Sequence, residues 1–128
     1  MMTVITHVTL NEGAEPEWDA AMRERLEKAR EHPGWVRGQL LIPLDGMNKR
    51  VVVGAWQSRA DWEAWHEGPA FVETRNRLEI LQADPGETVW YEVLVDHAAP
   101  PLRWLAGQAI GTVRKQANAL SRRLRGNQ

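Results

Sequence analysis

Three tryptophans gather in the stretch from Val51 to Leu78, where a β-branched segment runs into a helical pattern: Trp56, Trp62 and Trp65. Tryptophan buries a large apolar area and carries an indole N–H that needs a hydrogen-bond partner. A cluster of such side chains where a strand meets a helix either fills a core or lines a cavity for a flat ligand. The pattern leaves both interpretations open for Trp62 and Trp65, and it favours a structural role for Trp56.

An aromatic cavity needs polar groups before it can do chemistry on a bound molecule. Arg25, one helical turn beyond Met22, is the candidate cation for stabilising a phenolate, and Thr6 is the candidate hydrogen-bonding hydroxyl. The alternative for Arg25 is a solvated ion pair on its own acidic helix. The alternative for Thr6 is an ordinary strand residue with good β propensity.

The histidines indicate neither a general base nor a metal site. His7 neighbours Thr6 on a strand, so its side chain points to the opposite face, where we expect it to meet Glu92 of the last strand. The four histidines are dispersed and no carboxylate stands at ligand spacing, so no metal site is predicted. The absence of cysteine excludes disulfides and thiolate catalysis.

The charge of the chain is divided unevenly. The 128 residues carry a net charge of -1, but residues 1–100 hold 10 Lys and Arg against all 17 Asp and Glu. The remaining 28 residues hold 6 basic residues and no acid, so the two parts carry -7 and +6. The length suits one domain with a modest core, and no apolar run approaches the ~20 residues of a membrane span. These properties predict a soluble, cytoplasmic protein.

The hydrophobic periodicity predicts the order βαββαβ. Strands are expected over residues 4–10, 35–42, 50–56 and 87–95. One helix is expected to begin near Pro16 and end before His32, and another to begin at Ser58 and be interrupted at 68–69. The favoured solution is a ferredoxin-like α+β fold with a four-stranded antiparallel sheet and helices on one face. We assign this domain to residues 1–97 and a C-terminal helical extension to 98–128.

The strands read as apolar on both faces. Val51 and Val53 alternate with Val52 and Trp56, and the last strand shows the same pattern. One layer of helices covers only one face, so a second sheet is required, and a homodimer of stacked sheets supplies it.

Several short motifs resemble the antibiotic biosynthesis monooxygenase domain, a dimeric α+β barrel. They are Pro-Gly-Trp at 33–35, Gln-Leu-Leu-Ile-Pro at 39–43, Trp-Gln-Ser at 56–58, Trp62, Trp65, Gly-Pro at 68–69 and Phe71. That family includes cofactor-free, quinone-forming oxygenases and haem-degrading enzymes, so the resemblance is more specific for the fold than for the activity.

The haem-degrading branch implies three residues, of which this sequence keeps one. Its strand asparagine falls on Thr6, its tryptophan is matched by Trp65, and its axial histidine falls on Thr74 or Arg75. Neither a hydroxyl nor a guanidinium replaces a neutral imidazole on iron, so haem degradation is disfavoured.

The cofactor-free branch implies a monooxygenase that needs no cofactor and acts on a hydrophobic aromatic or polyketide-like substrate. The candidate catalytic residues are Arg25 and Thr6. The candidate substrate-binding residues are Met22, Val52, Gly54, Trp62, Trp65, Phe71, Thr74 and Leu78. The alternative is a non-catalytic module of the same fold that binds a small molecule or dimerises.

The basic C-terminal segment has an apolar stripe at helical spacing. The stripe consists of Leu102, Leu105, Ala109, Val113, Ala117, Leu120 and Leu124. A cationic amphipathic helix suits an acidic protein surface or a membrane surface. Because the body carries -7, the sequence favours docking on the protein's own dimer over a membrane, and no nucleic-acid partner is expected.

Overall fold

The computed structural model describes residues 1–101. Met1–Leu94 form one compact unit, and the chain from Val95 belongs to a separate one. The elements of the first unit are β1 (Met2–Thr9), α1 (Glu15–Ala29), β2 (Trp35–Leu41), β3 (Lys49–Trp56), α2 (Arg59–Glu67), α3 (Pro69–Glu79) and β4 (Glu87–Glu92). The predicted C-terminal helix lies outside the described residues.

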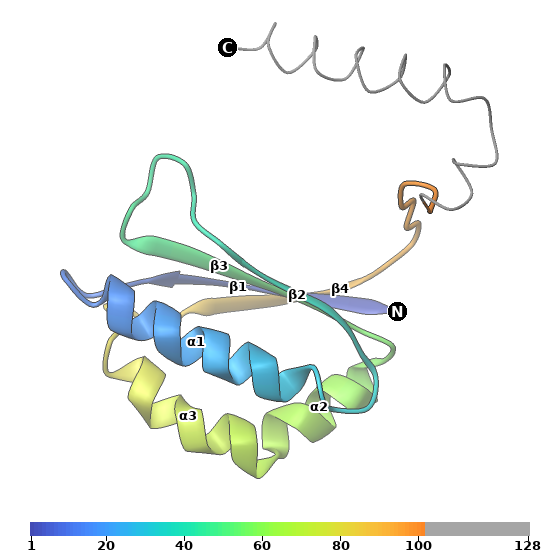
Figure 1. The fold of residues 1–128 in the computed structure, drawn as a ribbon, viewed down its shortest axis with the longest axis horizontal. Helices are drawn as coiled ribbons and strands as arrows, with labels where there is room; N and C mark the ends of the chain where they lie inside the picture. Colours follow the sequence, from blue (N-terminus) through green and yellow to red (C-terminus); the bar gives the residue numbers. More distant parts are fainter. Residues whose placement is uncertain (102–128) are drawn as a thin grey trace, which may run out of the picture. The chain divides into compact units, whose positions relative to one another are not determined.

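The four strands form one antiparallel sheet in the order β2-β3-β1-β4. The helices α1, α2 and α3 all lie on one face of this sheet (Figure 1). The predicted ferredoxin-like α+β fold is therefore confirmed. The interruption predicted at Gly68 is also present, and it divides the second helical region into α2 and α3.

Local signals explain where the helices begin. Pro16 occupies the first turn of α1, where its missing N–H costs no hydrogen bond. Ser58 caps α2: its side-chain oxygen accepts a hydrogen bond from the backbone N–H of Asp61 at 3.1 Å. Pro69 opens α3 directly after Gly68, whose extended backbone ends α2.

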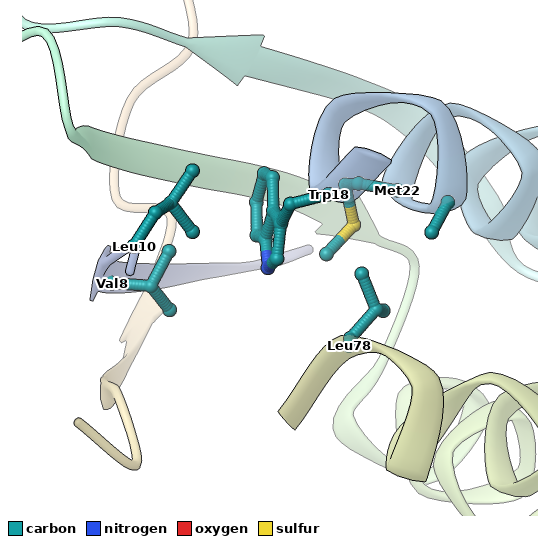
Figure 2. Packing of buried hydrophobic residues seen from close by; sticks show 6 residues of the cluster. Val8, Leu10, Trp18, Met22 and Leu78 are labelled. Carbon is teal, nitrogen blue, oxygen red and sulfur yellow. The ribbon is translucent and has the colours of Figure 1, made fainter. Parts of the chain in front are cut away.

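The core between sheet and helices has two parts. Around Trp18, which is fully buried, pack Val8, Leu10, Met22 and Leu78. Figure 2 shows the Trp18 ring standing between Val8 and Leu10 on one side and Met22 and Leu78 on the other. The second part consists of Met2, Val4, Ala29, Trp56 and Trp65.

The first and the last strand differ most from the ranges predicted from the sequence, whereas β2 and β3 differ by one residue each. The first strand begins at Met2, and Leu10 is left in an isolated bridge with Gln82. The last strand ends at Glu92 rather than at 95. Glu92 pairs with Met2 at the start of β1, and beyond it one backbone hydrogen bond follows, from the N–H of Val93 to the carbonyl of Met1 at 2.9 Å.

The expected contact between His7 and Glu92 is wrong. The register places His7 opposite Val51 on β3 and Glu87 on β4, whereas Glu92 pairs with Met2 at the other end of β1. The residue parity was read correctly, but the antiparallel register was not. His7 is exposed on the face that the helices leave open.

That open face is apolar in its middle. The register aligns Ile5, Val53 and Val89 across three strands, and Tyr91 lies beside this row. Val89 is 37% and Tyr91 49% exposed. Within Met1–Leu94 no second layer covers this face, so the homodimer stays a prediction.

Candidate functional site

A cavity of about 530 Å³ lies between the sheet and the helices. Its wall takes residues from β1, β3 and β4 on the sheet side and from α1, α2 and α3 on the helix side. One part of the wall is aromatic, with Trp35, Trp56, Trp62, Trp65 and Phe71. The ionisable and polar part contains Thr6, Thr88, Arg25, Arg75, His66, Glu79 and Gln82. This volume and this mixture suit a flat, largely apolar ligand with a few polar groups.

Arg25 reaches the cavity from α1, and its guanidinium is held at fixed points. Its Nε donates to the hydroxyl of Thr74 at 2.8 Å, and its Nη2 donates to the backbone carbonyl of Phe71 at 3.2 Å. Its Cζ lies 3.9 Å from the centroid of the Phe71 ring, a cation–π contact. Residues 1–101 place no carboxylate within ion-pair distance of this group.

The surroundings of Arg25 make its positive charge costly. Burial, and then the nearby charge of Arg75, lower the pKa of Arg25 to about 10. The group is still protonated at neutral pH. A cation with neutral hydrogen-bond partners in an aromatic wall leaves its positive potential for an anionic ligand. The alternative for Arg25, an ion pair with an acidic residue of its own helix, is not present among the described residues. The acidic residue Glu24 of α1 instead accepts a hydrogen bond from Arg77 of α3 at 2.7 Å.

Thr74 does not border the cavity, although the sequence analysis placed it there. It is 3% exposed and lies behind Arg25. Its hydroxyl accepts from Arg25 and donates back to a carbonyl of its own helix, that of Phe71 at 3.0 Å. Thr74 therefore positions the guanidinium and is not part of the cavity wall.

Thr6 shares its hydrogen bond with the next strand. Its hydroxyl lies 3.0 Å from that of Thr88, and both residues border the cavity. Two hydroxyls joined by one hydrogen bond keep one further O–H and free lone pairs. Gly54 on β3, which pairs with Val4, lets its neighbours approach the backbone closely, because a Cβ there would lie 3.3 Å from Val4 and 3.4 Å from the indole nitrogen of Trp56.

The tryptophans of the wall pack against different partners. Trp65 stacks on Trp56 with ring centroids 6.5 Å apart and meets the edge of Phe71. Trp62 instead contacts His66 and Trp90. Both Trp56 and Trp65 border the cavity, and both are almost completely buried. The pattern favoured a structural role for Trp56, but both rings belong to the core and also to the cavity wall.

His66 borders the cavity at the end of α2, just before the break between α2 and α3. Its ring centroid lies 4.2 Å from that of Phe71 and 4.7 Å from that of Trp62. Burial and the charges of Arg75 and Arg25 lower the pKa of His66. The residues predicted from the sequence do not include His66, yet its position one helical turn after Trp62 places it on the same helix face.

Nine of the ten residues proposed from the sequence border the cavity: Thr6, Met22, Arg25, Val52, Gly54, Trp62, Trp65, Phe71 and Leu78. Four further residues of the wall, His66, Arg75, Thr88 and Gln82, are absent from the predicted set. Helix periodicity could have identified Arg75, because it lies four residues after Phe71 and three before Leu78 on α3. Thr88 had none, because its position depends on the pairing of β4 with β1.

The described residues offer no site for a metal ion. Over residues 1–101, histidine, aspartate and glutamate nowhere gather in a group of three that can hold one. In the same part of the chain, the helices are too short or too polar to cross a membrane.

Three comparisons relate the chain to known proteins. A haem oxygenase of Mycobacterium tuberculosis that produces mycobilin is 28% identical over 92 residues, which are 72% of this chain and 88% of that protein. A protein of Nitrosomonas europaea assigned to the antibiotic biosynthesis monooxygenases superposes with a TM-score of 0.70 at 23% identity, covering 74% of this chain and all of that one. SnoaB, a cofactor-independent oxygenase of Streptomyces nogalater, superposes with a TM-score of 0.67 at 21% identity, over 78% and 97% of the two chains.

At these identities the two superpositions show the fold alone. The family assignment comes from the sequence itself, because the profile of one family matches residues 1–77, more than half of the 128. The same stretch holds β1 to β3, α2 and most of α3, and with them most of the cavity wall. The chain therefore belongs to the antibiotic biosynthesis monooxygenase family.

Proposed function

We propose that this protein is a cofactor-independent monooxygenase that acts on a hydrophobic aromatic or polyketide-like substrate. One observation carries the proposal: Arg25 points its cationic group into an aromatic cavity and is held there by neutral partners. Such a group stabilises an anion more than the neutral molecule from which the anion forms.

The chemistry follows from the stability of that anion. An anthrone-type carbon that loses a proton becomes an electron-rich anion that reduces dioxygen directly. One oxygen atom replaces two hydrogens as a new carbonyl, and the other leaves as water with these two hydrogens, so the substrate supplies all four electrons that reduce dioxygen. The aromatic wall holds the ring and excludes water, the Thr6 and Thr88 hydroxyls bind a ring oxygen, and Arg25 faces the negative charge.

Haem does not fit the residues at the positions where the family resemblance expects its ligand. Arg75 borders the cavity with a guanidinium, and Thr74 is buried with its hydroxyl bonded to Arg25. Neither group ligates iron as a neutral imidazole does. The similarity to the mycobacterial haem oxygenase therefore supports the fold around this cavity, and the proposed reaction does not use haem.

Oxygen uptake with anthrone tests the proposal. The protein should accelerate oxygen consumption above the spontaneous rate, without added flavin, haem or metal, and a chelator should leave the rate unchanged. Labelled dioxygen should place one labelled atom in the anthraquinone. Tight binding of aromatic probes with no oxygen uptake from anthrone or its hydroxylated derivatives would favour the alternative, a non-catalytic binding module.

We also propose that two copies pair through the open sheet face, which the row of Ile5, Val53 and Val89 makes apolar. Light scattering should give twice the 14.6 kDa of one chain. Val53→Arg should give a folded monomer, because it places a charge in the middle of that face. Val72→Arg is the matched control on the exposed side of α3. A wild-type monomer at low micromolar concentration would contradict the stacked-sheet arrangement.

A further inference from the structure

His66 is an ionisable side chain of the cavity wall to which the proposed reaction assigns no task. It is half-buried on the last turn of α2, and its ring lies against Phe71, 4.2 Å between centroids. Arg25 lies against the same Phe71 ring, with its Cζ 3.9 Å from the centroid. An imidazole and a guanidinium thus reach one cavity from two different helices, and both contact the same aromatic ring.

The charged groups around His66 favour its neutral form. Burial contributes most to lowering its pKa below the ordinary 6.5, and Arg75 of α3 and Arg25 of α1 act in the same direction. Glu67, its neighbour on α2, opposes them. Glu79 is the remaining charged residue of the wall. Because the pKa is lowered, the neutral imidazole is the main form at pH 7, and it has a lone pair with which to accept a proton.

We propose that His66 is the general base that removes the proton from the substrate. This inference rests on the proposed monooxygenase function. The substrate's C–H or O–H bond breaks, an N–H bond forms on the imidazole, and the electron pair stays on the substrate as an anion that faces Arg25. After dioxygen has been reduced, His66 returns this proton to the oxygen atom that leaves as water.

Arg25 and His66 have complementary roles in forming the anion, and neither group can fill both roles. Arg25 is protonated at neutral pH and cannot accept a proton, whereas His66 in its neutral form cannot supply a resident positive charge. Once His66 has taken the proton, the anion faces two cations, which lowers the free energy of the ion pair. The repulsion from Arg75 and Arg25, which adds to burial in keeping His66 neutral in the free protein, is thereby relieved when the anion forms.

Substrates of graded acidity test this role. With anthrone, which is neutral at the assay pH, His66→Gln should lower kcat by about 10²–10⁴-fold. With a hydroxyanthrone that is already ionised at that pH, the same variant should keep nearly the wild-type rate. His66→Phe keeps a flat ring against Phe71 and should behave like His66→Gln. An equal loss with both substrates would overturn the proposal.

The pH profile gives a second readout. The wild-type kcat/KM for anthrone should fall as the pH drops through a pKa below 6.5, because protonation removes the base. This acid limb should disappear in His66→Gln and persist in Glu79→Gln, which changes the other ionisable group of the wall that can accept a proton. Persistence of the limb in both variants would assign it to another group. His97→Gln, an exposed histidine, is the matched control.

A binding measurement keeps this inference separate from the proposed function. 4-Nitrophenol, which turns yellow on ionisation, is bound without oxygen at a pH where the free probe is mainly neutral. Wild type should bind the yellow anion and release no proton to the buffer. His66→Gln should either release one proton for each anion bound or bind the colourless form. If both proteins form the anion without proton release, His66 is not the acceptor, whether or not anthrone is oxidised.

Discussion

Arg25→Gln should lower kcat for anthrone oxidation by about 10²–10³-fold, the usual loss when one preorganised donor facing a developing negative charge is removed. Glutamine retains hydrogen-bonding capacity but has no charge. The guanidinium is fixed by Thr74 and by the carbonyl of Phe71, so wild-type Arg25 needs little reorganisation when the anion forms. Stopped-flow oxygen consumption at saturating anthrone measures the effect.

Two further variants show whether charge, geometry or folding is responsible. Arg23→Gln removes an exposed guanidinium from the same helix two residues earlier and should leave kcat unchanged. Arg25→Lys keeps the charge but loses the planar fork that contacts Thr74 and lies over Phe71, so it should restore only part of the rate. If Arg25→Gln oxidises anthrone as fast as wild type, the guanidinium in the aromatic cavity has no role in catalysis, and the proposed function loses its main support.

Trp56→Ala should lower the free energy of unfolding by about 3–5 kcal/mol, the usual cost of deleting a buried tryptophan. Its ring is 1% exposed and packs against Trp35, Trp65 and His32. Neighbouring rings cannot collapse into the space without leaving their own packing. Chemical denaturation followed by circular dichroism measures the loss, and it should be cooperative.

Trp90→Ala is the matched control, because this tryptophan is 41% exposed at the edge strand β4. Its loss should be much smaller. Trp65→Ala should cost nearly as much as Trp56→Ala, because Trp65 is only 5% exposed. A Trp56→Ala variant as stable as Trp90→Ala would show that the aromatic cluster is not part of the core.

The sequence predicted the fold because the signals for it are local. The stripe of Trp18 and Met22 on α1, the Ser58 cap and the break at Gly68 each depend on neighbouring residues only. Their order then left few topologies to consider. The strand ends were less readable, since the end of β4 depends on where β1 begins.

The sequence predicted less of the candidate site than of the fold. Helix periodicity placed Arg25 on the same side as Met22, but it did not show which partner holds the guanidinium. Thr74 was read as a ligand contact and is instead the support of Arg25, because the distance between α1 and α3 decides which side chain stands in front. His66 is absent from the predicted residues, because it meets Phe71 only through the break in the helix between them.

That break between α2 and α3 has a consequence for how the cavity can change shape. In an uninterrupted helix, residues five apart, such as His66 and Phe71, point about 140° away from each other. Gly68 and Pro69 redirect the chain so that the two rings meet. A helical wall made of two short pieces has a joint, so the direction of α3, and with it the place of Phe71 and Arg75 in the wall, does not have to follow the turn of α2. Leu78 in the core then fixes the far end of α3 against the sheet.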